Sequence, residues 1–329
     1  MISPSRTREE YLSPVVSSAR LTVLGSLNMD ISVTVPRLPA PGATVLGGAA
    51  AFAPGGKGAN QAVAAARLGG DVLMAGCVGD DDFGRALRAA LVAEGVSDAA
   101  VRTVRGVPTG LAMITVDKGG ENIITVAPGA NREAGPAEVN AVSEATDAAA
   151  LVISAEVPAA AIRAALTAGS YGLRVLNLAP APREAAGIVA AGVDWLVVNE
   201  SEATAVLGRP VAGLAGAAGA AGAAADLARA GASNAVVTAG AAGAAYCGPA
   251  GALIVPGFPV RPVDSVGAGD TFVGALAVAL AAGVPPHDAV IAAAAAGAAA
   301  ATRPGTQAGM PRPADVRAAT GHSWPVAAG

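Results

Sequence analysis

Short, nearly continuous apolar segments alternate along the chain with longer segments in which apolar residues recur at helical spacing. The apolar segments predict strands buried on both faces, and the longer segments predict helices between them. This alternation indicates an α/β fold with a mainly parallel central sheet that helices cover on both sides. The predicted strands are residues 21–27, 71–79, 151–157, 174–180, 194–200 and 234–240, and the predicted helices include 59–68, one after Asp82 and two Ala-rich helices after Asp270.

Two segments break this alternation. Residues 31–54 and 107–127 alternate Val, Thr, Ile and Met with small or polar residues around Pro-Gly and Gly-Gly turns. This pattern predicts strands of a small antiparallel sheet added to one end of the main domain. A lid over a ligand site is the functional interpretation, and a structural appendage or dimer interface is the alternative; the two are compatible.

The rest of the chain shows no domain boundary. We expect residues 1–20 to form a loosely ordered extension and residues 21–320 to form a single domain. The low-complexity segment 211–225 is expected to open a helix of modest stability, because glycine costs about 1 kcal/mol relative to alanine in a helix. The N-terminus carries Glu9 and Glu10 and has no unbroken apolar region typical of a secretory signal.

Composition narrows the function classes. Only 14% of the 329 residues are charged and the net charge is -4, with no basic stripe, which disfavours a nucleic-acid partner. The hydrophobic fraction of 53% is largely alanine. The longest apolar run, 289–301, is shorter than the ~20 residues that span a bilayer, so we expect a cytoplasmic protein with no membrane partner. Cys77 and Cys247 lie in apolar surroundings and are expected to be buried hydrophobes.

Polar side chains cluster where the predicted strands end, the edge at which parallel sheets bind ligands. Asn28 and Asp30 project from the same face if the strand continues, and a paired amide and carboxylate suit vicinal sugar hydroxyls. A turn motif is the structural alternative for this pair.

A glycine-rich loop around Lys57 and Asn60 leads into the first predicted helix. It is not a P-loop, because Ala51 and Gly58 stand where Gly and Ser/Thr are required. Its amides and its ammonium group suit a polyhydroxy or anionic ligand. The alternative is a tight turn with Lys57 solvated.

Two further motifs suit phosphate chemistry. Asn199 and Glu202 have the spacing to order Mg²⁺-bound water near a phosphate, with helix capping as the competing role. In GAGD, successive amides of residues 267–270 at a helix start suit an anion hole for a transferring phosphoryl group, with Asp270 beside it. A helix N-cap is the structural alternative for Asp270.

Several motifs occur in a characteristic order: GSLNMD, PGGKGANQA, VPTG with GENIITVAPGAN, VNESE and DSVGAGDTFVGA. From about Leu21 to Pro313 the sequence closely resembles the PfkB carbohydrate kinase family, in its ribokinase branch. The resemblance implies a ribokinase-like three-layer α/β/α core with a mainly parallel central sheet and a small β-sheet lid, often shared across a homodimer interface. It also implies ATP-dependent phosphorylation of D-ribose at O5.

The resemblance also implies roles for individual residues. Asp270 matches the general base, and Gly267, Ala268 and Gly269 match the anion hole. The sugar-binding positions are Asn28, Asp30, Gly56, Lys57, Gly58, Ala59, Asn60 and Glu156. The positions for ATP and Mg²⁺ are Asn199, Glu202, Thr238, Ala239, Gly240, Ala241, Ala242, Gly243 and Gly269.

A monovalent-cation site for K⁺ is implied in the same way. Its matching positions are Asp264, Val266, Ala300, Arg303, Gly305 and Gly309. Gly309 stands where a serine is common, which removes one hydroxyl ligand. Ala294 stands where a histidine often lies near the adenine, so we leave it out of the expected nucleotide site.

Two alternatives stay open at this point. A related kinase would act on 2-deoxyribose, another sugar or a nucleoside. A non-catalytic sugar sensor would keep the fold without turnover, although the intact Gly-Ala-Gly-Asp motif disfavours it.

Overall fold

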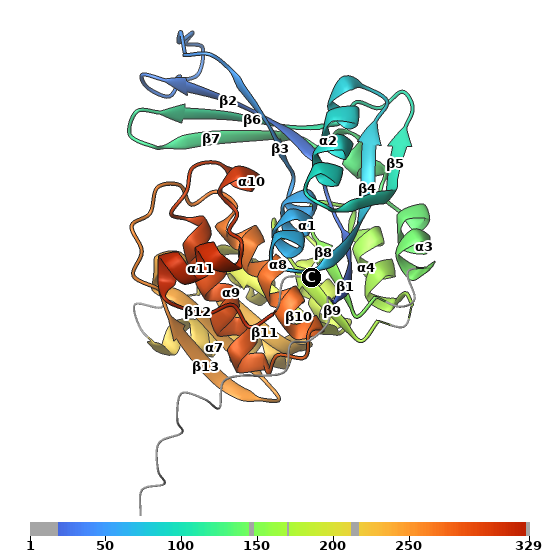
Figure 1. Cartoon of the computed structure of the whole chain (residues 1–329), viewed down its shortest axis with the longest axis vertical. Helices are drawn as coiled ribbons and strands as arrows, with labels where there is room; N and C mark the ends of the chain where they lie inside the picture. The colour runs from blue at the N-terminus through green and yellow to red at the C-terminus, as the bar shows by residue number, and fades with distance from the viewer. Residues whose placement is uncertain (1–18, 145–147, 170, 212–216, 327–329) are drawn as a thin grey trace, which may run out of the picture.

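A nine-stranded sheet forms the centre of the protein (Figure 1). The computed structural model describes residues 19–144, 148–169, 171–211 and 217–326, so most of the predicted 1–20 extension lies outside the described residues. Seven adjacent strands are parallel, and two antiparallel strands extend one edge. The mainly parallel central sheet is therefore confirmed. In spatial order the strands are β13 (Gly251–Pro256), β12 (Gly243–Gly248), β11 (Ala232–Thr238), β10 (Val193–Asn199), β9 (Leu173–Asn177), β8 (Ala150–Ser154), β1 (Arg20–Leu24), β4 (Asp71–Gly79) and β5 (Ser97–Val104).

Helices cover both faces of this sheet. One layer consists of α1 (Lys57–Arg67), α2 (Asp82–Ala93), α8 (Ala268–Ala281), α9 (Pro286–Ala300) and α11 (Pro313–Thr320), with the short α10 (Thr306–Gly309) beside it. The other layer consists of α3 (Pro136–Glu144), α4 (Ala159–Thr167), α5 (Ala185–Ala190), α6 (Glu200–Leu207) and α7 (Ala217–Ala230). Two 3₁₀ turns, η1 (Gly129–Glu133) and η2 (Gly240–Ala242), complete the elements. The predicted helix in 211–225 is α7, and residues 212–216 lie outside the described part.

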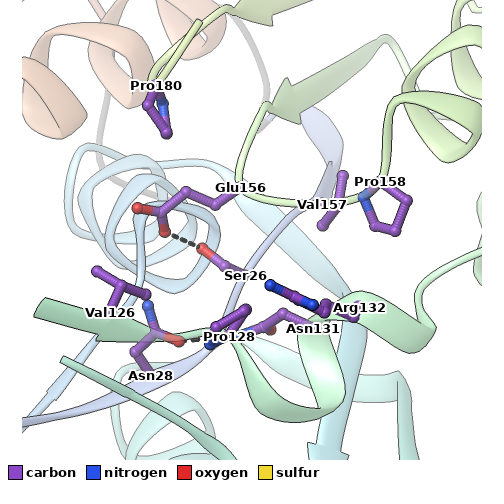
Figure 2. A pocket seen from close by; sticks show the side chains of 10 residues that line it. All are labelled: Ser26, Asn28, Val126, Pro128, Asn131, Arg132, Glu156, Val157, Pro158 and Pro180. Atoms are coloured by element: carbon purple, nitrogen blue, oxygen red, sulfur yellow. Dashed lines mark hydrogen bonds between the residues drawn. The ribbon is translucent and has the colours of Figure 1, made fainter. Parts of the chain in front are cut away.

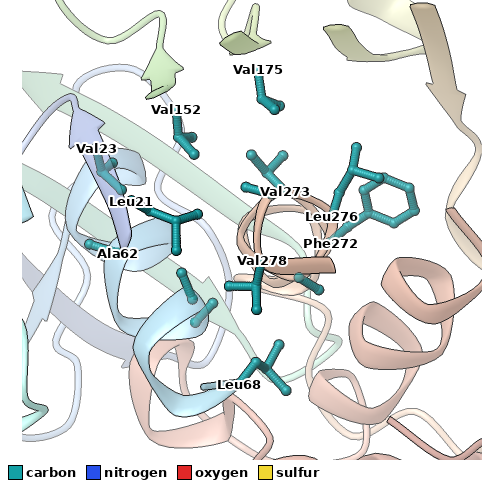
Figure 3. Packing of buried hydrophobic residues seen from close by; sticks show 14 of the residues in the cluster. Leu21, Val23, Ala62, Leu68, Val152, Val175, Phe272, Val273, Leu276 and Val278 are labelled. Atoms are coloured by element: carbon teal, nitrogen blue, oxygen red, sulfur yellow. The ribbon is translucent and has the colours of Figure 1, made fainter. Parts of the chain in front are cut away.

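The strand side chains divide between two hydrophobic clusters, one on each face. Val23 and Val152 point into the cluster around α8, whereas Leu24 and Ile153 point into the opposite one. Figure 3 shows α8 with Val273 and Leu276 set among these strand residues. This period-two division is what a sheet buried on both faces requires.

The two helices nearest the site, α1 and α8, approach each other closely. A Cβ on Gly274 of α8 would lie 2.7 Å from the carbonyl oxygen of Gln61 in α1. Only glycine fits there without displacing one of the two backbones. This contact fixes the start of α8 relative to the start of α1, and both helix starts carry site residues.

A second, four-stranded sheet projects from one end of the body (Figure 1). Its order is β3 (Ala51–Gly55), β2 (Asn28–Val35), β6 (Gly110–Asp117) and β7 (Asn122–Ala127). The outer pairings are antiparallel, but β2 and β6 pair in parallel, which differs from the purely antiparallel sheet expected. The reason is topological: β2 follows β1 and β6 follows β5, so both leave the same edge of the large sheet in the same direction.

Two smaller expectations concern the membrane and the cysteines. Among the described residues, no helix is both long enough and apolar enough to cross a bilayer.

Cys77 is a free, buried thiol as expected, whereas Cys247 is free and only partly buried.

Candidate active site

Asp270 lies in the first turn of α8. Gly267, with φ of 80°, is the N-cap residue, and no side chain caps the helix. The Asp270 side chain is 7% exposed. Its Oδ2 accepts a hydrogen bond from Asn60 Nδ2 at 2.9 Å, and its Oδ1 accepts one from Gln61 Nε2 at 3.1 Å. The helix-cap alternative for Asp270 is therefore wrong, because the carboxylate faces α1 instead of its own helix amides.

The backbone amides before Asp270 form the start of the same helix. Ala268 N donates to the carbonyl of Ser265 at 3.3 Å. Among the described residues, the amides of Gly267, Gly269 and Asp270 donate to no protein backbone acceptor. Unpaired amides at a helix N-terminus, together with the helix dipole, suit an anion.

Asn28 and Asp30 lie on one face of β2, so the turn alternative for this pair is wrong. Asn28 Oδ1 accepts a hydrogen bond from Asn131 Nδ2 at 2.8 Å. Asn131 also bonds the backbone N–H and C=O of Leu27, at 2.9 and 3.1 Å. A Cβ at Gly110 would lie 2.2 Å from Asn28 Oδ1 and 2.3 Å from Asn131 Nδ2, so this arrangement requires glycine there.

A cavity of about 580 Å³ opens beside Asn28 (Figure 2). Glu156 reaches it from the loop after β8, and Glu156 Oε2 accepts hydrogen bonds from Ser26 Oγ at 2.6 Å and from Lys57 N at 3.2 Å. The cavity therefore brings together two of the predicted sugar-binding side chains. Its lining consists of Ser26, Asn28, Val126, Pro128, Asn131, Arg132, Glu156, Val157, Pro158 and Pro180.

The glycine-rich loop has a partly structural role. Gly56 precedes α1 with φ of 90°, a conformation that favours glycine. The amide of Gly58 donates to Ser26 Oγ at 3.4 Å, and the amide of Ala59 donates to the carbonyl of Ser26 at 3.0 Å. Two positions expected at the sugar thus hold α1 against the turn between β1 and β2.

Lys57 is surrounded by carboxylates. Asp270, followed by Glu156 and Glu202, raises the pKa of the Lys57 ammonium above its usual value, against the effect of burial. Burial, with the nearby charges of Glu156 and Asp270, raises the pKa of Asp30 to about 6. The alternative of a solvated Lys57 is therefore wrong; its positive charge sits within an acidic, half-buried cluster.

Asn199 and Glu202 form a capping box at the start of α6. Asn199 Oδ1 accepts from the Glu202 amide at 2.9 Å, and Glu202 Oε2 accepts from the Asn199 amide at 2.8 Å. Burial raises the pKa of Glu202. The charge of Asp270 raises it further, whereas the hydrogen bond from the Asn199 amide and the charge of Lys57 lower it. Asn199 and Glu202 therefore do cap α6, and the Glu202 carboxylate also interacts electrostatically with Lys57 and Asp270.

A second cavity, of about 270 Å³, lies at the start of α8 on the side of β11. Residues 239–243 form a backbone turn in its wall, in which Ala239 N donates to Gly243 O at 2.9 Å and Ala242 N donates to Ala239 O at 3.0 Å. Ala294, excluded from the expected nucleotide site, lies in the lining. The lining consists of Thr238, Gly240, Ala241, Gly243, Gly257, Phe258, Val260, Pro262, Ser265, Ala268, Gly269, Phe272, Ala294, Gly297, Ala298 and Ala301.

The positions expected to hold a monovalent cation come together at one loop. Asp264 accepts hydrogen bonds from the amides of Val266 and Gly305, at 3.0 and 2.9 Å. A Cβ on Gly309 would meet the carbonyl oxygens of Arg303 at 3.1 Å, Pro304 at 3.4 Å and Ala300 at 3.6 Å. Three carbonyl oxygens thus face Gly309, in the loop whose Gly305 amide bonds the Asp264 carboxylate. Carbonyl and carboxylate oxygens are the donors that a hard cation prefers.

Several site residues escaped the sequence reasoning. Gln61, Asn131, Asn177 and Gln307 are buried polar residues that hold the predicted ones in place. Within the part of the chain that the structure describes, no group of three or more His, Cys, Asp and Glu side chains is placed to hold a metal ion.

Known proteins share this architecture and sequence. Residues 18–313 match the model of the pfkB family of carbohydrate kinases. A ribokinase of Haemophilus influenzae is 36% identical over 295 residues, covering 88% of this chain and 95% of the relative. A ribokinase of Bacillus subtilis is 36% identical, covering 88% and 96%. A deoxyribokinase of Salmonella typhi is 33% identical, covering 78% and 84%.

Solved structures give the same result. The crystal structure of a ribokinase from Thermotoga maritima superposes with a TM-score of 0.80 at 32% identity, covering 91% of this chain and 98% of that one. A ribokinase of Arabidopsis thaliana, solved with ribose and ATP, has a TM-score of 0.78 at 29% identity, covering 91% and 97%. The family match spans nearly all of the described fold and every motif of the site. The chain belongs to the pfkB family of carbohydrate kinases.

Proposed function

We propose that this protein is an ATP-dependent sugar kinase that phosphorylates D-ribose at O5, with Asp270 as general base. The observation that carries the proposal is the position of the buried Asp270 carboxylate. It directly follows Gly269, which lines the cavity beside β11, and its charge acts on Asp30 and Lys57 on the sugar side. A base in that position lies where a nucleotide and a sugar would meet.

The chemistry follows from this arrangement. The Asp270 carboxylate accepts the proton of the ribose hydroxyl as its oxygen attacks the γ-phosphorus. The amides of Gly267 and Gly269 and the Lys57 ammonium neutralise charge that develops on the phosphoryl oxygens. Asn28, Asp30 and Glu156 hold the sugar hydroxyls, and closure of the four-stranded sheet excludes water from the transfer.

ATP and Mg²⁺ belong to the same proposal. ATP lies in the cavity beside β11, with its phosphates toward the start of α8. Asn199 and Glu202 would orient Mg²⁺ and its water at the start of α6, where the charges of Lys57 and Asp270 act on Glu202. The bound ion would supply charge neutralisation at the phosphates.

We also propose a K⁺ site at the loop of Asp264. Its support is the set of converging carbonyl oxygens that faces Gly309. Serine is absent at position 309, so the cation would rely on carbonyl oxygens and the Asp264 carboxylate. Dependence on ATP further favours a cytoplasmic location.

A homodimer formed through the four-stranded sheet completes the proposal. The sheet exposes large apolar side chains that the body of the protein does not cover, among them Ile124 and Val126. Contiguous exposed apolar surface of this kind marks interaction sites in soluble proteins.

The test is ATP-dependent turnover of D-ribose, 2-deoxyribose and adenosine by the purified protein with Mg²⁺, with K⁺ or with Na⁺ alone. We expect ribose to give the highest kcat/KM and K⁺ to raise kcat. Asp270→Asn should still bind ribose but lose about 10²- to 10⁴-fold in kcat, the usual contribution of a general base.

Asp82→Asn is the matched control, because Asp82 also lies in the first turn of a helix but its side chain is 96% exposed. Its kcat should equal that of the parent. Near-normal turnover by Asp270→Asn would refute the base assignment. A higher kcat/KM for 2-deoxyribose or adenosine than for ribose would keep the kinase and change the acceptor.

A further inference from the structure

A chain of side-chain amides leads from α10 to the Asp270 carboxylate. Gln307 Nε2 donates a hydrogen bond to Asn60 Oδ1 at 3.1 Å. Asn60 Nδ2 in turn donates to Asp270 Oδ2 at 2.9 Å. Gln307 is 9% exposed and Asn60 is 5% exposed, so solvent does not readily replace either contact.

The direction of each hydrogen bond in this chain is fixed by chemistry. An ionised carboxylate only accepts, and the NH₂ group of a glutamine only donates. Asn60 therefore presents its NH₂ to Asp270 and its oxygen to Gln307. Rotation of the Asn60 amide by 180° would place oxygen against oxygen at one end and NH₂ against NH₂ at the other.

The second carboxylate oxygen is held in a similar way. Gln61 Nε2 donates to Asp270 Oδ1 at 3.1 Å and to Asn177 Oδ1 at 2.9 Å. Asn177 Nδ2 donates to the carbonyl of Val197 at 3.2 Å, which fixes its own orientation. The two oxygens of Asp270 thus each meet an N–H whose direction is set by a residue farther away.

Gln307 is held in place independently of its side chain. Arg67 Nη1 donates to the backbone carbonyls of Gln307 at 2.6 Å and Met310 at 2.8 Å. Arg67 is itself paired with Glu94 at 2.6 Å. Replacing only the Gln307 side chain should therefore leave α10 anchored to the end of α1.

We propose that Gln307 is a positioning residue for the base: by fixing the Asn60 amide, it keeps an N–H donor, and not a carbonyl oxygen, against Asp270. Gln307 is not among the residues that line either cavity, and its side chain connects to Asp270 through Asn60. The inference rests on the proposed role of Asp270 as base.

Two near-isosteric variants separate the donor from the volume of the side chain. Gln307→Met removes the donor and keeps the size. Gln307→Glu introduces a group that donates when protonated but only accepts when ionised. Once ionised, it would draw the NH₂ of Asn60 to itself and turn the Asn60 oxygen toward Asp270.

The expected results are distinct for the two variants. Gln307→Met should lose about 10- to 100-fold in kcat, the scale of a misplaced catalytic group, with less than about threefold change in the KM for ribose and for ATP. Gln307→Glu, which sets a second acceptor against Asn60 when ionised, should lose at least as much kcat as Gln307→Met at one fixed pH of about 8, again with less than about threefold change in both KM values.

Ala308→Glu is the matched control, because it places the same carboxyl group one residue along on an exposed position of α10. Its kcat and its KM values should stay within twofold of the parent. Tm is measured for all variants, and the Gln307 variants should unfold within a few degrees of the parent.

Two outcomes would overturn the inference. If both Gln307 variants keep kcat within twofold of the parent, the amide does not position the base. If their loss of activity follows a large loss of Tm, Gln307 has a structural role instead. Failure of the proposed function is distinguishable from failure of this inference, because the parent itself would then not phosphorylate ribose. In that case kcat of each variant is compared with that of the parent on the acceptor that the parent does phosphorylate.

Discussion

Asp30 shows at the scale of one residue what a carboxylate proposed to bind the sugar costs the fold. It is packed against Gly55, where a Cβ would lie 2.2 Å from Asp30 Oδ2. Burial and the charges of Glu156 and Asp270 raise its pKa from 3.8 to about 6. Because the pKa is raised on folding, the ionised carboxylate destabilises the native state at every pH above about 6, and this cost disappears below about 4.

We therefore expect Asp30→Asn to make the protein more stable and a poorer enzyme. A shift from 3.8 to about 6 corresponds to about 3 kcal/mol at full strength, and screening by solvent reduces this to about 1 to 2 kcal/mol. Urea denaturation should show the gain growing between pH 4 and pH 6 and staying constant above. The KM for ribose should rise, since an amide has one acceptor oxygen and no charge where a carboxylate has two charged acceptor oxygens.

An equal stability of the two proteins at pH 7.5 would contradict this account. Asp117→Asn provides a comparison in the same small sheet, because the Asp117 side chain only accepts hydrogen bonds from the turn amides of Gly119 and Glu121. It should give no gain in stability.

The residues predicted from sequence differ in kind from those that were missed. Asn28, Asp30 and Glu156 could be predicted because polar side chains are unexpected at the ends of buried strands. Gln61 and Gln307 could not, since a glutamine in a helix reads as an ordinary surface residue. Asp270, the partner of Gln61, lies 209 residues from it, and Asn60, the partner of Gln307, lies 247 residues from it, so only the folded chain shows these contacts.

Among the elements, the contact between α1 and α8 decides the geometry of the base. Asn60 and Gln61 belong to α1 and Asp270 belongs to α8, so the distance between the helices sets their hydrogen bonds. A Cβ at Gly274 would lie 2.7 Å from Gln61 O and 2.9 Å from Ala65 N. Both neighbours are backbone atoms and have little freedom to move.

The same substitution should have opposite signs in two helices. Gly274→Ala should destabilise the protein by about 1 to 3 kcal/mol, as overpacking does, and should lower kcat because it separates the base from its amides. Gly222→Ala in α7 has nothing within 4 Å of the new Cβ, and it should stabilise the protein by about 0.5 to 1 kcal/mol. Thermal unfolding and steady-state kinetics of both variants test this. A neutral Gly274→Ala would mean that the two helices are free to separate.

Which elements could be predicted follows from their burial. The strands β4, β8 and β10 are mostly buried and appear in the sequence as apolar runs. Half of the edge strand β5 and most of the outermost strand β13 are exposed, so neither has such a run. Much of the wall of the cavity beside β11 was missed for the opposite reason, because Phe258 and Val260 do not stand out in an apolar sequence. Ala294 was left out because alanine stands where a histidine is common.

For the whole molecule, the four-stranded sheet is the part whose environment is incomplete in a single chain. Ile124 and Val126 of β7 are 51% and 46% exposed, on the sheet face that also carries Asp30. The opposite face is partly covered, since Phe52 stacks on Phe83 of α2 at 6.2 Å. The opposite face also exposes Phe52 and Met113, at 59% and 47%. We place the second copy on the site side because that face carries Asn28 and Asp30, the proposed sugar-binding residues.

We expect the protein to sediment as a dimer and Ile124→Glu to shift it toward the monomer. Burying an unpaired carboxylate at an interface is unfavourable, and loss of the dimer should also raise the KM for ribose. Ile123→Glu is the matched control, because Ile123 is 48% exposed but projects from the opposite face. Sedimentation equilibrium distinguishes the two variants. A monomeric parent, or greater dissociation by Ile123→Glu, would contradict the proposed interface.

The hydrogen bonds around Asp270 also have a consequence for the order in which the chain is made. Asn60 meets Asp270 across 210 residues and Gln307 across 247 residues. During synthesis from the N-terminus, the segments that carry Asn28 and Glu156 leave the ribosome long before α8 and α10 do. A nascent chain therefore has its proposed sugar-binding residues early but receives the proposed base, and the amide proposed to position it, last. With these roles, an unfinished chain lacks the means to consume ATP.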